Sequence, residues 1–205
     1  MAAKKKAAAK KRVQKQAPEP TELLLTELRE IYSAENQLIK AMPRLTKAME
    51  SETLHELMNR RLEQAEELVA DIENVFEEME ETPGRVKNVA AEGLLRDAQE
   101  HIQEIPKGPA LDAVLIGAVQ KLEHYCIAAW GTSRAFAEAL EIDSAVQAMQ
   151  RAIDEGKELD EELTELAVEE INPAMLAMGE DDEEMEEEDE QPKRRGRRGS
   201  DEARA

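Results

Sequence analysis

The sequence has few aromatic residues, one cysteine and no long apolar run. Aromatic residues make up 2 % of the 205 residues, which favours helices packed on helices over a β-sandwich. A single cysteine excludes an internal disulfide framework and is typical of a reducing cytoplasm. No run approaches the roughly 20 apolar residues of a membrane span, and the first residues lack the apolar segment of a secretory signal. We therefore expect a cytoplasmic, all-α protein without a membrane span.

Motifs of common catalytic sites are also missing. The sequence holds no Gly-rich phosphate loop, no Cys-x-x-Cys, no His-Glu-x-x-His and no nucleophile elbow. The methionines at core spacing are explained by packing, without copper or haem. No catalytic residue and no small-molecule substrate can be assigned.

The charge is arranged in blocks. Residues 1–16 carry seven basic residues and no acid, residues 180–190 carry ten acids, and residues 193–198 read KRRGRR. Such blocks are typical of disorder, so we expect a basic disordered tail over 1–20 and an acidic, then basic, disordered tail over 174–205. Residues 17–179 carry 35 acidic and 14 basic residues, a net charge of −21. This body should repel nucleic acid, which only the basic tails could contact.

Hydrophobic periodicity predicts a helical bundle over residues 21–173. The four long helices are expected at 21–50, 51–80, 110–140 and 143–171, with a shorter helix at 90–105. The short connections within the first and last pairs predict antiparallel hairpins. The short helix lies in the long connection between them, as in ferritin-like four-helix bundles.

Glu35 is a carboxylate where the first helix needs a core residue. It lies near the middle of the apolar stripe formed by Leu24, Leu28, Ile31, Leu38, Ile39 and Met42. An unpaired carboxylate in an apolar layer costs several kcal/mol, so a proton, a metal or another side chain should meet Glu35 inside the fold.

The two hairpins show an internal repeat of core-facing polar positions. Gln64 follows Glu35 by 29 residues, and Gly156 follows Cys126 by 30 residues, with Asp160 one turn later. Such a repeat is what a twofold di-metal bundle needs, since each hairpin supplies ligands from both of its helices. We expect these side chains to share one interior layer, with a gap beside Gly156.

Four segments resemble the YciE/YciF-type ferritin-like family, a bacterial group associated with stress responses. They read IYSAENQL (31–38), VAAEGLL (89–95), QKLEHYCIAAWGT (120–132) and LTELA (163–167). The resemblance spans about residues 22–172 and implies a ferritin-like bundle that forms a homodimer.

This chain departs from the family pattern at four positions where the family has a carboxylate or an amide. The resemblance implies Glu at positions 35, 64, 126 and 156, Gln at 68 and Asp at 160. This chain keeps only Glu35 and Asp160 of these carboxylates and has Gln64, Leu68, Cys126 and Gly156 at the other positions. Two carboxylates with weak partners are poor ligands for two cations.

Other acidic residues give a competing ligand set, but helical phase argues that they are solvated. They are Glu63, Glu66, Glu123, Glu155 and Glu158. The histidines His55, His101 and His124 also lie off the apolar stripes, where surface positions are commoner than ligand positions.

Two functional interpretations remain. The first is a non-catalytic stress protein whose dinuclear site has degenerated, with Glu35 and Asp160 held by hydrogen bonds or sharing a proton and no metal bound. The second is a di-iron or single-metal protein that handles iron or peroxide. Its iron or manganese ligands would be Glu35, Asp160, Gln64 and nearby acids, and Cys126 is a further candidate ligand of the remnant site.

Overall fold

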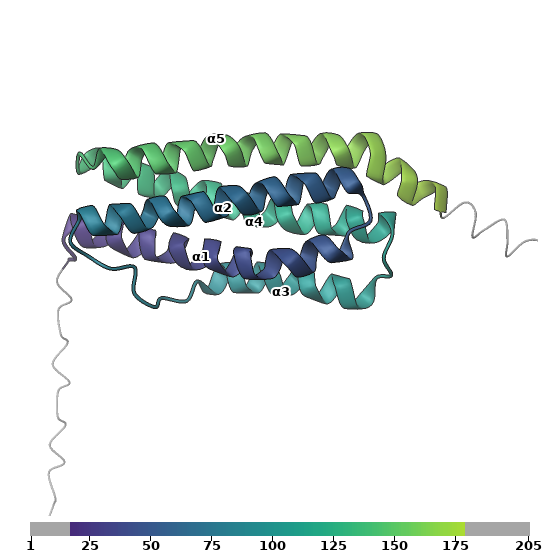
Figure 1. Cartoon of the computed structure of the whole chain (residues 1–205), viewed down its shortest axis with the longest axis horizontal. Coiled ribbons are helices and arrows are strands. Elements are labelled where there is room, and N and C mark those ends of the chain that lie inside the picture. The colour runs from purple at the N-terminus through teal and green to yellow at the C-terminus, as the bar shows by residue number, and fades with distance from the viewer. Residues whose placement is uncertain (1–16, 179–205) are drawn as a thin grey trace, which may run out of the picture.

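The computed structural model describes residues 17–178, and this part of the chain is an all-α bundle. Its helices are α1 (Pro20–Ala48), α2 (Glu52–Glu78), α3 (Val89–Glu104), α4 (Pro109–Ala139) and α5 (Asp143–Leu166). α1 and α2 form one hairpin and α4 and α5 the other, while α3 packs against α1 and α4 (Figure 1). The predicted all-α helical bundle is confirmed.

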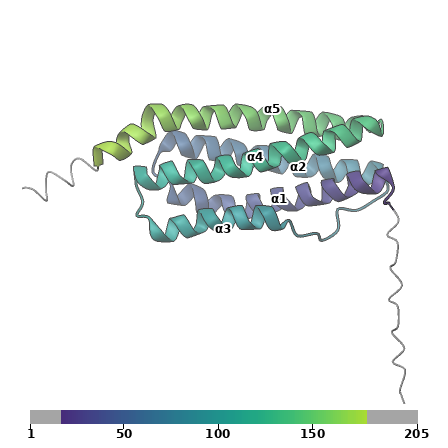
Figure 2. The same cartoon turned by 180° about the vertical axis from the view of Figure 1, so that it is seen from behind.

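The short fifth helix lies outside the four-helix core. Seen from behind, α3 runs beside α1 and α4, on the side of the bundle opposite α5 (Figure 2). The connection 79–88 and α3 together carry the chain from one hairpin to the other. None of the helices in residues 17–178 combines the length and the apolar character that crossing a membrane requires.

Polar side chains fix the helix ends. The Ser51 hydroxyl accepts a hydrogen bond from the Leu54 N–H and caps α2. The Asn88 side chain accepts from the Ala91 N–H, caps α3, and donates to the Glu30 carbonyl of α1. These caps therefore satisfy backbone groups and also join neighbouring helices.

The last helix continues beyond its predicted end. We expected it to stop ahead of Asn172-Pro173, with disorder from residue 174, but the chain stays helical to residue 178. A π-helical turn over Ala167–Ile171 precedes the proline, and the Asn172 N–H donates to the Ala167 carbonyl. A widened turn accommodates a proline that lacks its own N–H. Of the tails predicted over 1–20 and 174–205, the parts at 1–16 and 179–205 lie outside the described residues.

Candidate functional site

The centre of the bundle holds a buried ion-pair cluster of Arg61, Glu35 and Glu123. Arg61 on α2 is 2 % exposed, and both carboxylates are 0 % exposed. The Arg61 Nη2 donates to Glu35 Oε2 at 2.9 Å, and its Nε donates to Glu123 Oε1 at 2.6 Å. One guanidinium therefore joins α1 and α4 through α2, in the middle of an apolar core.

The planar guanidinium also lies over an aromatic ring. Its Cζ is 5.6 Å from the centroid of the Trp130 ring of α4. Arginine suits this position because its fork of donors can meet two carboxylates while its face stacks on the indole. The single tryptophan of the chain is thus a direct neighbour of the cluster.

The electrostatics of the cluster favour a permanent cation at its centre. Burial alone would lower the pKa of Arg61, but the Glu123 and Glu35 carboxylates raise it above its ordinary value. Burial raises the pKa of Glu123, Glu35 raises it further, and Arg61 opposes the shift. One positive and two negative groups leave an excess negative charge, which a proton on Glu123 would remove.

Cys126 lies in the same layer, as predicted, but it is not an activated nucleophile. It is buried one turn beyond Glu123 on α4. Burial raises the pKa of its thiol well above the ordinary value, and the nearby Glu35 and Glu123 carboxylates raise it further. The thiol is therefore the stable form, and Cys126 acts as a small core residue.

Asp160 lies at the edge of the core with partners of its own. Its side chain is 24 % exposed and lies 3.2 Å from His124 Nε2. Its Oδ1 accepts a hydrogen bond from Gln120 Nε2 at 3.1 Å. Glu35 instead pairs with Arg61, so the expected shared proton between Glu35 and Asp160 is wrong. The physical reason is that an arginine reaches Glu35 from α2.

Gln64 lies beside Arg61 and lines a cavity of about 10 Å³ next to Trp130 and Gly156. Of the gap expected beside Gly156 only this small cavity remains, because the Trp130 ring fills the space. A Cβ at Gly156 would lie 2.7 Å from Trp130 Cζ3 and 3.4 Å from Glu123 Oε2. Glycine at position 156 is what allows the tryptophan to reach Arg61.

Sequence reasoning missed Arg61 and misplaced Glu123. Arg61 follows Leu57 by four residues and precedes Ala65 by four, so it lies on the buried stripe of α2. Glu123 was grouped with the solvated acids, yet it follows the buried Val119 by four residues. Helical phase places both residues on buried stripes, although it does not show which side chains they contact. The surface position inferred for Glu63 and Glu66 agrees with the structure.

A metal ion does not fit this set of side chains as it stands. The position between the two buried carboxylates is held by a guanidinium that makes hydrogen bonds to both. Among residues 17–178, no three His, Cys, Asp or Glu side chains converge as a group that could hold a metal ion. The assignment of Glu35, Asp160, Gln64 and Cys126 as metal ligands stays a prediction.

Residues 19–176 match a family model described as a domain of unknown function, DUF892. The chain belongs to this family. Over 146 residues, or 71 % of this chain and 88 % of the relative, it is 38 % identical to protein YciF of Escherichia coli K12. The resemblance predicted from the four sequence segments is therefore confirmed.

Two solved structures share the fold. The crystal structure of the E. coli stress protein YciF matches with a TM-score of 0.72 at 35 % identity, covering 76 % of this chain and 99 % of that one. YcfI of Rhodopseudomonas palustris, for which a structural role has been suggested, matches with a TM-score of 0.68 at 32 % identity. That match covers 72 % of this chain and 94 % of YcfI.

Proposed function

We propose that this DUF892 protein is a non-catalytic stress protein whose interior carboxylates are neutralised by Arg61 in place of a metal. The observation that supports the proposal is the guanidinium held between Glu35 and Glu123 in a fully buried cluster. A fixed positive charge there disfavours a divalent cation by like-charge repulsion and by occupying the carboxylate oxygens. The stress role follows from the similarity to YciF.

Metal analysis tests the proposal directly. The full chain, purified without chelator and then incubated with Fe(II) or Mn(II), should retain less than stoichiometric metal after gel filtration. Weak binding to surface acids is expected in a chain of net charge −20. Glu35→Ala should therefore leave the retained metal unchanged, as should the matched surface variant Glu63→Ala.

The second candidate function, a metal protein that handles iron or peroxide, makes the opposite prediction. It is favoured by Glu35 Oε1 and Glu123 Oε2, which are buried and have no hydrogen-bond partner among the described residues. Stoichiometric metal that is lost in Glu35→Ala and Glu123→Ala, but kept in Glu63→Ala, would establish that function. A quench of Trp130 fluorescence on metal addition would place the metal in the cluster.

A further inference from the structure

The exposed face of the second half of α1 is basic, although the body is strongly acidic. Lys40, Arg44 and Lys47 are exposed and follow one another at spacings of four and three residues, so they project from one side of the helix. No acidic residue lies between Glu35 and Glu50. Lys107 approaches the same end, with its Nζ 3.5 Å from the Lys47 carbonyl oxygen. These four residues form the basic face.

None of the four basic residues has a carboxylate partner within the part of the chain that the structure describes. Ion pairs there join most other basic side chains to acids, as for Arg29, Arg60 and Arg151. Glu50 is the acid closest in sequence to Lys47. Its carboxylate lies next to Gly108, which follows Lys107, but it forms no ion pair with any of the four among the described residues. Unpaired cations gathered on one face of an acidic protein are a binding surface for an anionic partner.

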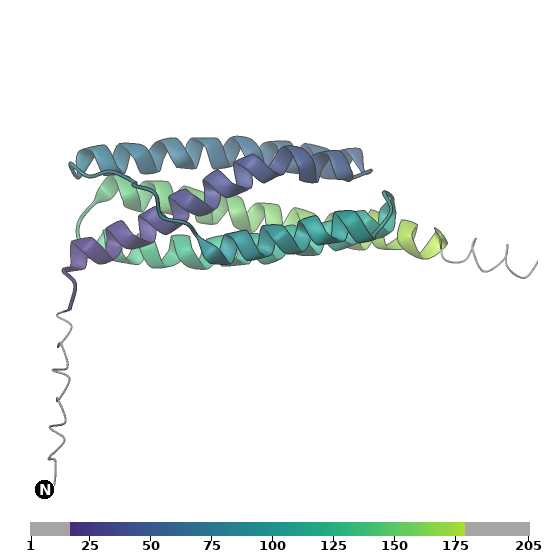
Figure 3. The same ribbon diagram turned by 90° about the horizontal axis from the view of Figure 1, so that it is seen from below.

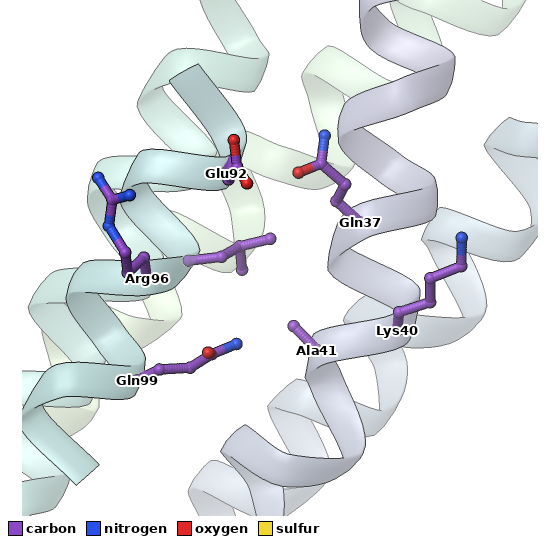
Figure 4. A pocket seen from close by; sticks show the side chains of 7 residues that line it. Gln37, Lys40, Ala41, Glu92, Arg96 and Gln99 are labelled. Atoms are coloured by element: carbon purple, nitrogen blue, oxygen red, sulfur yellow. The ribbon is translucent and has the colours of Figure 1, made fainter. Parts of the chain in front are cut away.

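A groove between α1 and α3 adjoins the basic face at Lys40. It has a volume of about 360 Å³ and is lined by Gln37, Lys40, Ala41, Glu92, Leu95, Arg96 and Gln99. Lys40 and Arg96 come from opposite walls, as Figure 4 shows. Leu95 and Ala41 are buried and give the groove an apolar floor. Such a groove suits an extended segment that has both carboxylates and an occasional apolar side chain.

The chain itself provides a segment with this chemistry. Residues 180–190 hold ten acids and one methionine, Met185, and they begin two residues after the last described residue. Residue 178 lies at the end of the bundle where α1 ends and α4 begins, and residue 17 lies at the opposite end (Figure 3). The described chain therefore leaves the bundle, toward residues 180–190, at the end that holds Lys47 and Lys107, and it enters the bundle after residues 1–16 at the opposite end.

The acidic segment is long enough to follow the basic face. Lys40 and Lys47 are about 10 Å apart along the helix axis, at about 1.5 Å per residue. Eleven residues in extended conformation span up to about 36 Å, so the segment can cross the end of the bundle and follow this face. We propose that residues 180–190 dock on the basic face of the same chain and cover it.

Zero-length carbodiimide cross-linking of the full chain tests this docking. The reagent joins a lysine amine to a carboxylate only where the two are in contact. Peptide mass spectrometry should find residues 180–190 linked to Lys40, Lys47 or Lys107. Lys157 is the matched control, since it is exposed and has no ion pair among the described residues, but lies on α5. Its links should be about tenfold fewer, because unpaired charges are screened beyond about 10 Å.

A triple variant of the basic face tests the docking at a lysine that the variant leaves unchanged. In Lys40→Gln/Arg44→Gln/Lys47→Gln, the link to the unchanged Lys107 should fall several-fold, whereas Lys157→Gln should leave it unchanged. Links to the lysines of residues 1–16, or equal links to Lys157, would overturn the proposal. So would links between isotopically labelled and unlabelled chains, or binding of double-stranded DNA that the triple variant abolishes.

Discussion

The bundle buries carboxylates at two places, and it satisfies them differently. At one end Asp112 of α4 is 1 % exposed and accepts from the backbone N–H groups of Glu50 (2.9 Å) and Ser51 (2.8 Å). At the centre Glu35 and Glu123 are equally buried but are met by one side chain, Arg61. The end site joins α4 to the α1–α2 turn, and the central site joins three helices.

The two sites differ in whether all of their carboxylate oxygens accept a hydrogen bond. Both oxygens of Asp112 accept hydrogen bonds, whereas Glu35 and Glu123 each keep one buried oxygen without a partner among the described residues. A helix-end carboxylate held by amides needs no counter-ion, since the amides already supply positive dipoles. The central carboxylates depend entirely on Arg61. Under the proposed function, the centre is where Arg61 takes the place of a metal, whereas the end site is held by backbone amides.

Removing the central cation should have the largest effect. Arg61→Met leaves two buried carboxylates without a counter-charge, so we expect the free energy of unfolding to fall by about 3–5 kcal/mol. Urea unfolding at pH 7, followed by Trp130 fluorescence, measures it. Arg60→Met is the control, because Arg60 forms a surface ion pair with Glu162 that should contribute at most about 1 kcal/mol. Equal losses in the two variants would contradict the central role of Arg61.

Replacing the whole cluster with apolar side chains tests whether unbalanced buried charge causes the loss of stability in Arg61→Met. Glu35→Leu/Arg61→Met/Glu123→Leu should restore stability to the wild-type level or raise it by about 1–4 kcal/mol, because no buried charge then remains. A triple variant as unstable as Arg61→Met would show that the geometry of the cluster, rather than charge balance, holds the centre together.

The end site should respond less. Asp112→Ala leaves the N–H groups of Glu50 and Ser51 without their acceptor, and we expect a loss of about 1–3 kcal/mol in the free energy of unfolding. Asp154→Ala is the control. Among the described residues, exposed Asp154 accepts only from the Gln150 side chain, so the change should alter stability by at most about 0.5 kcal/mol. If Asp112→Ala costs more than Arg61→Met, the ranking of the two sites is wrong.

The sequence predicts the frame of the bundle better than its centre. Helix ranges follow from a period that every turn repeats, and the predicted bounds lie within two residues of the observed ones except at the end of α5. That exception depends on a π turn ahead of Pro173, which the spacing of apolar residues does not predict. The need for a partner of Glu35 could also be predicted, because the cost of an unpaired buried charge is general.

The identity of that partner could not be read from spacing alone. The family pattern predicts ligand positions at Gln64 and Asp160. It gives no role to a basic residue on a buried stripe. Arg61 is buried only because Glu35, Glu123 and Trp130 meet it from two other helices. Such a partner depends on tertiary packing, and so does the choice of glycine at position 156.

Gly156 gives a smaller and more local test of the centre. In Gly156→Ala the new methyl group would press on the Trp130 ring, and overpacking of this kind costs about 1–3 kcal/mol, partly offset by about 1 kcal/mol of helix propensity. Gly131→Ala in α4 has no atom within 4 Å of the new methyl group and should stabilise by about 0.5–1 kcal/mol. Differential scanning calorimetry of the two variants should show opposite shifts of Tm.

Titration of Glu123 should give the smallest effect, because Arg61 opposes the shift that burial produces in its pKa. With a raised pKa, folded Glu123 keeps its proton at pH values where the unfolded chain has lost it. The contribution of Glu123 to stability should therefore fall as pH rises from the ordinary carboxyl pKa through the raised one, and stay constant above it. One proton limits the slope to about 1.4 kcal/mol per pH unit.

The variant Glu123→Gln isolates this term from the other carboxyl groups, which titrate in both proteins. Its amide oxygen can still accept from Arg61 Nε, while the excess negative charge of the cluster is gone. Urea unfolding at a series of pH values should show wild-type stability falling relative to Glu123→Gln as pH rises. The opposite slope would mean that Arg61 outweighs burial and holds Glu123 ionised, so that the cluster carries its negative charge at neutral pH.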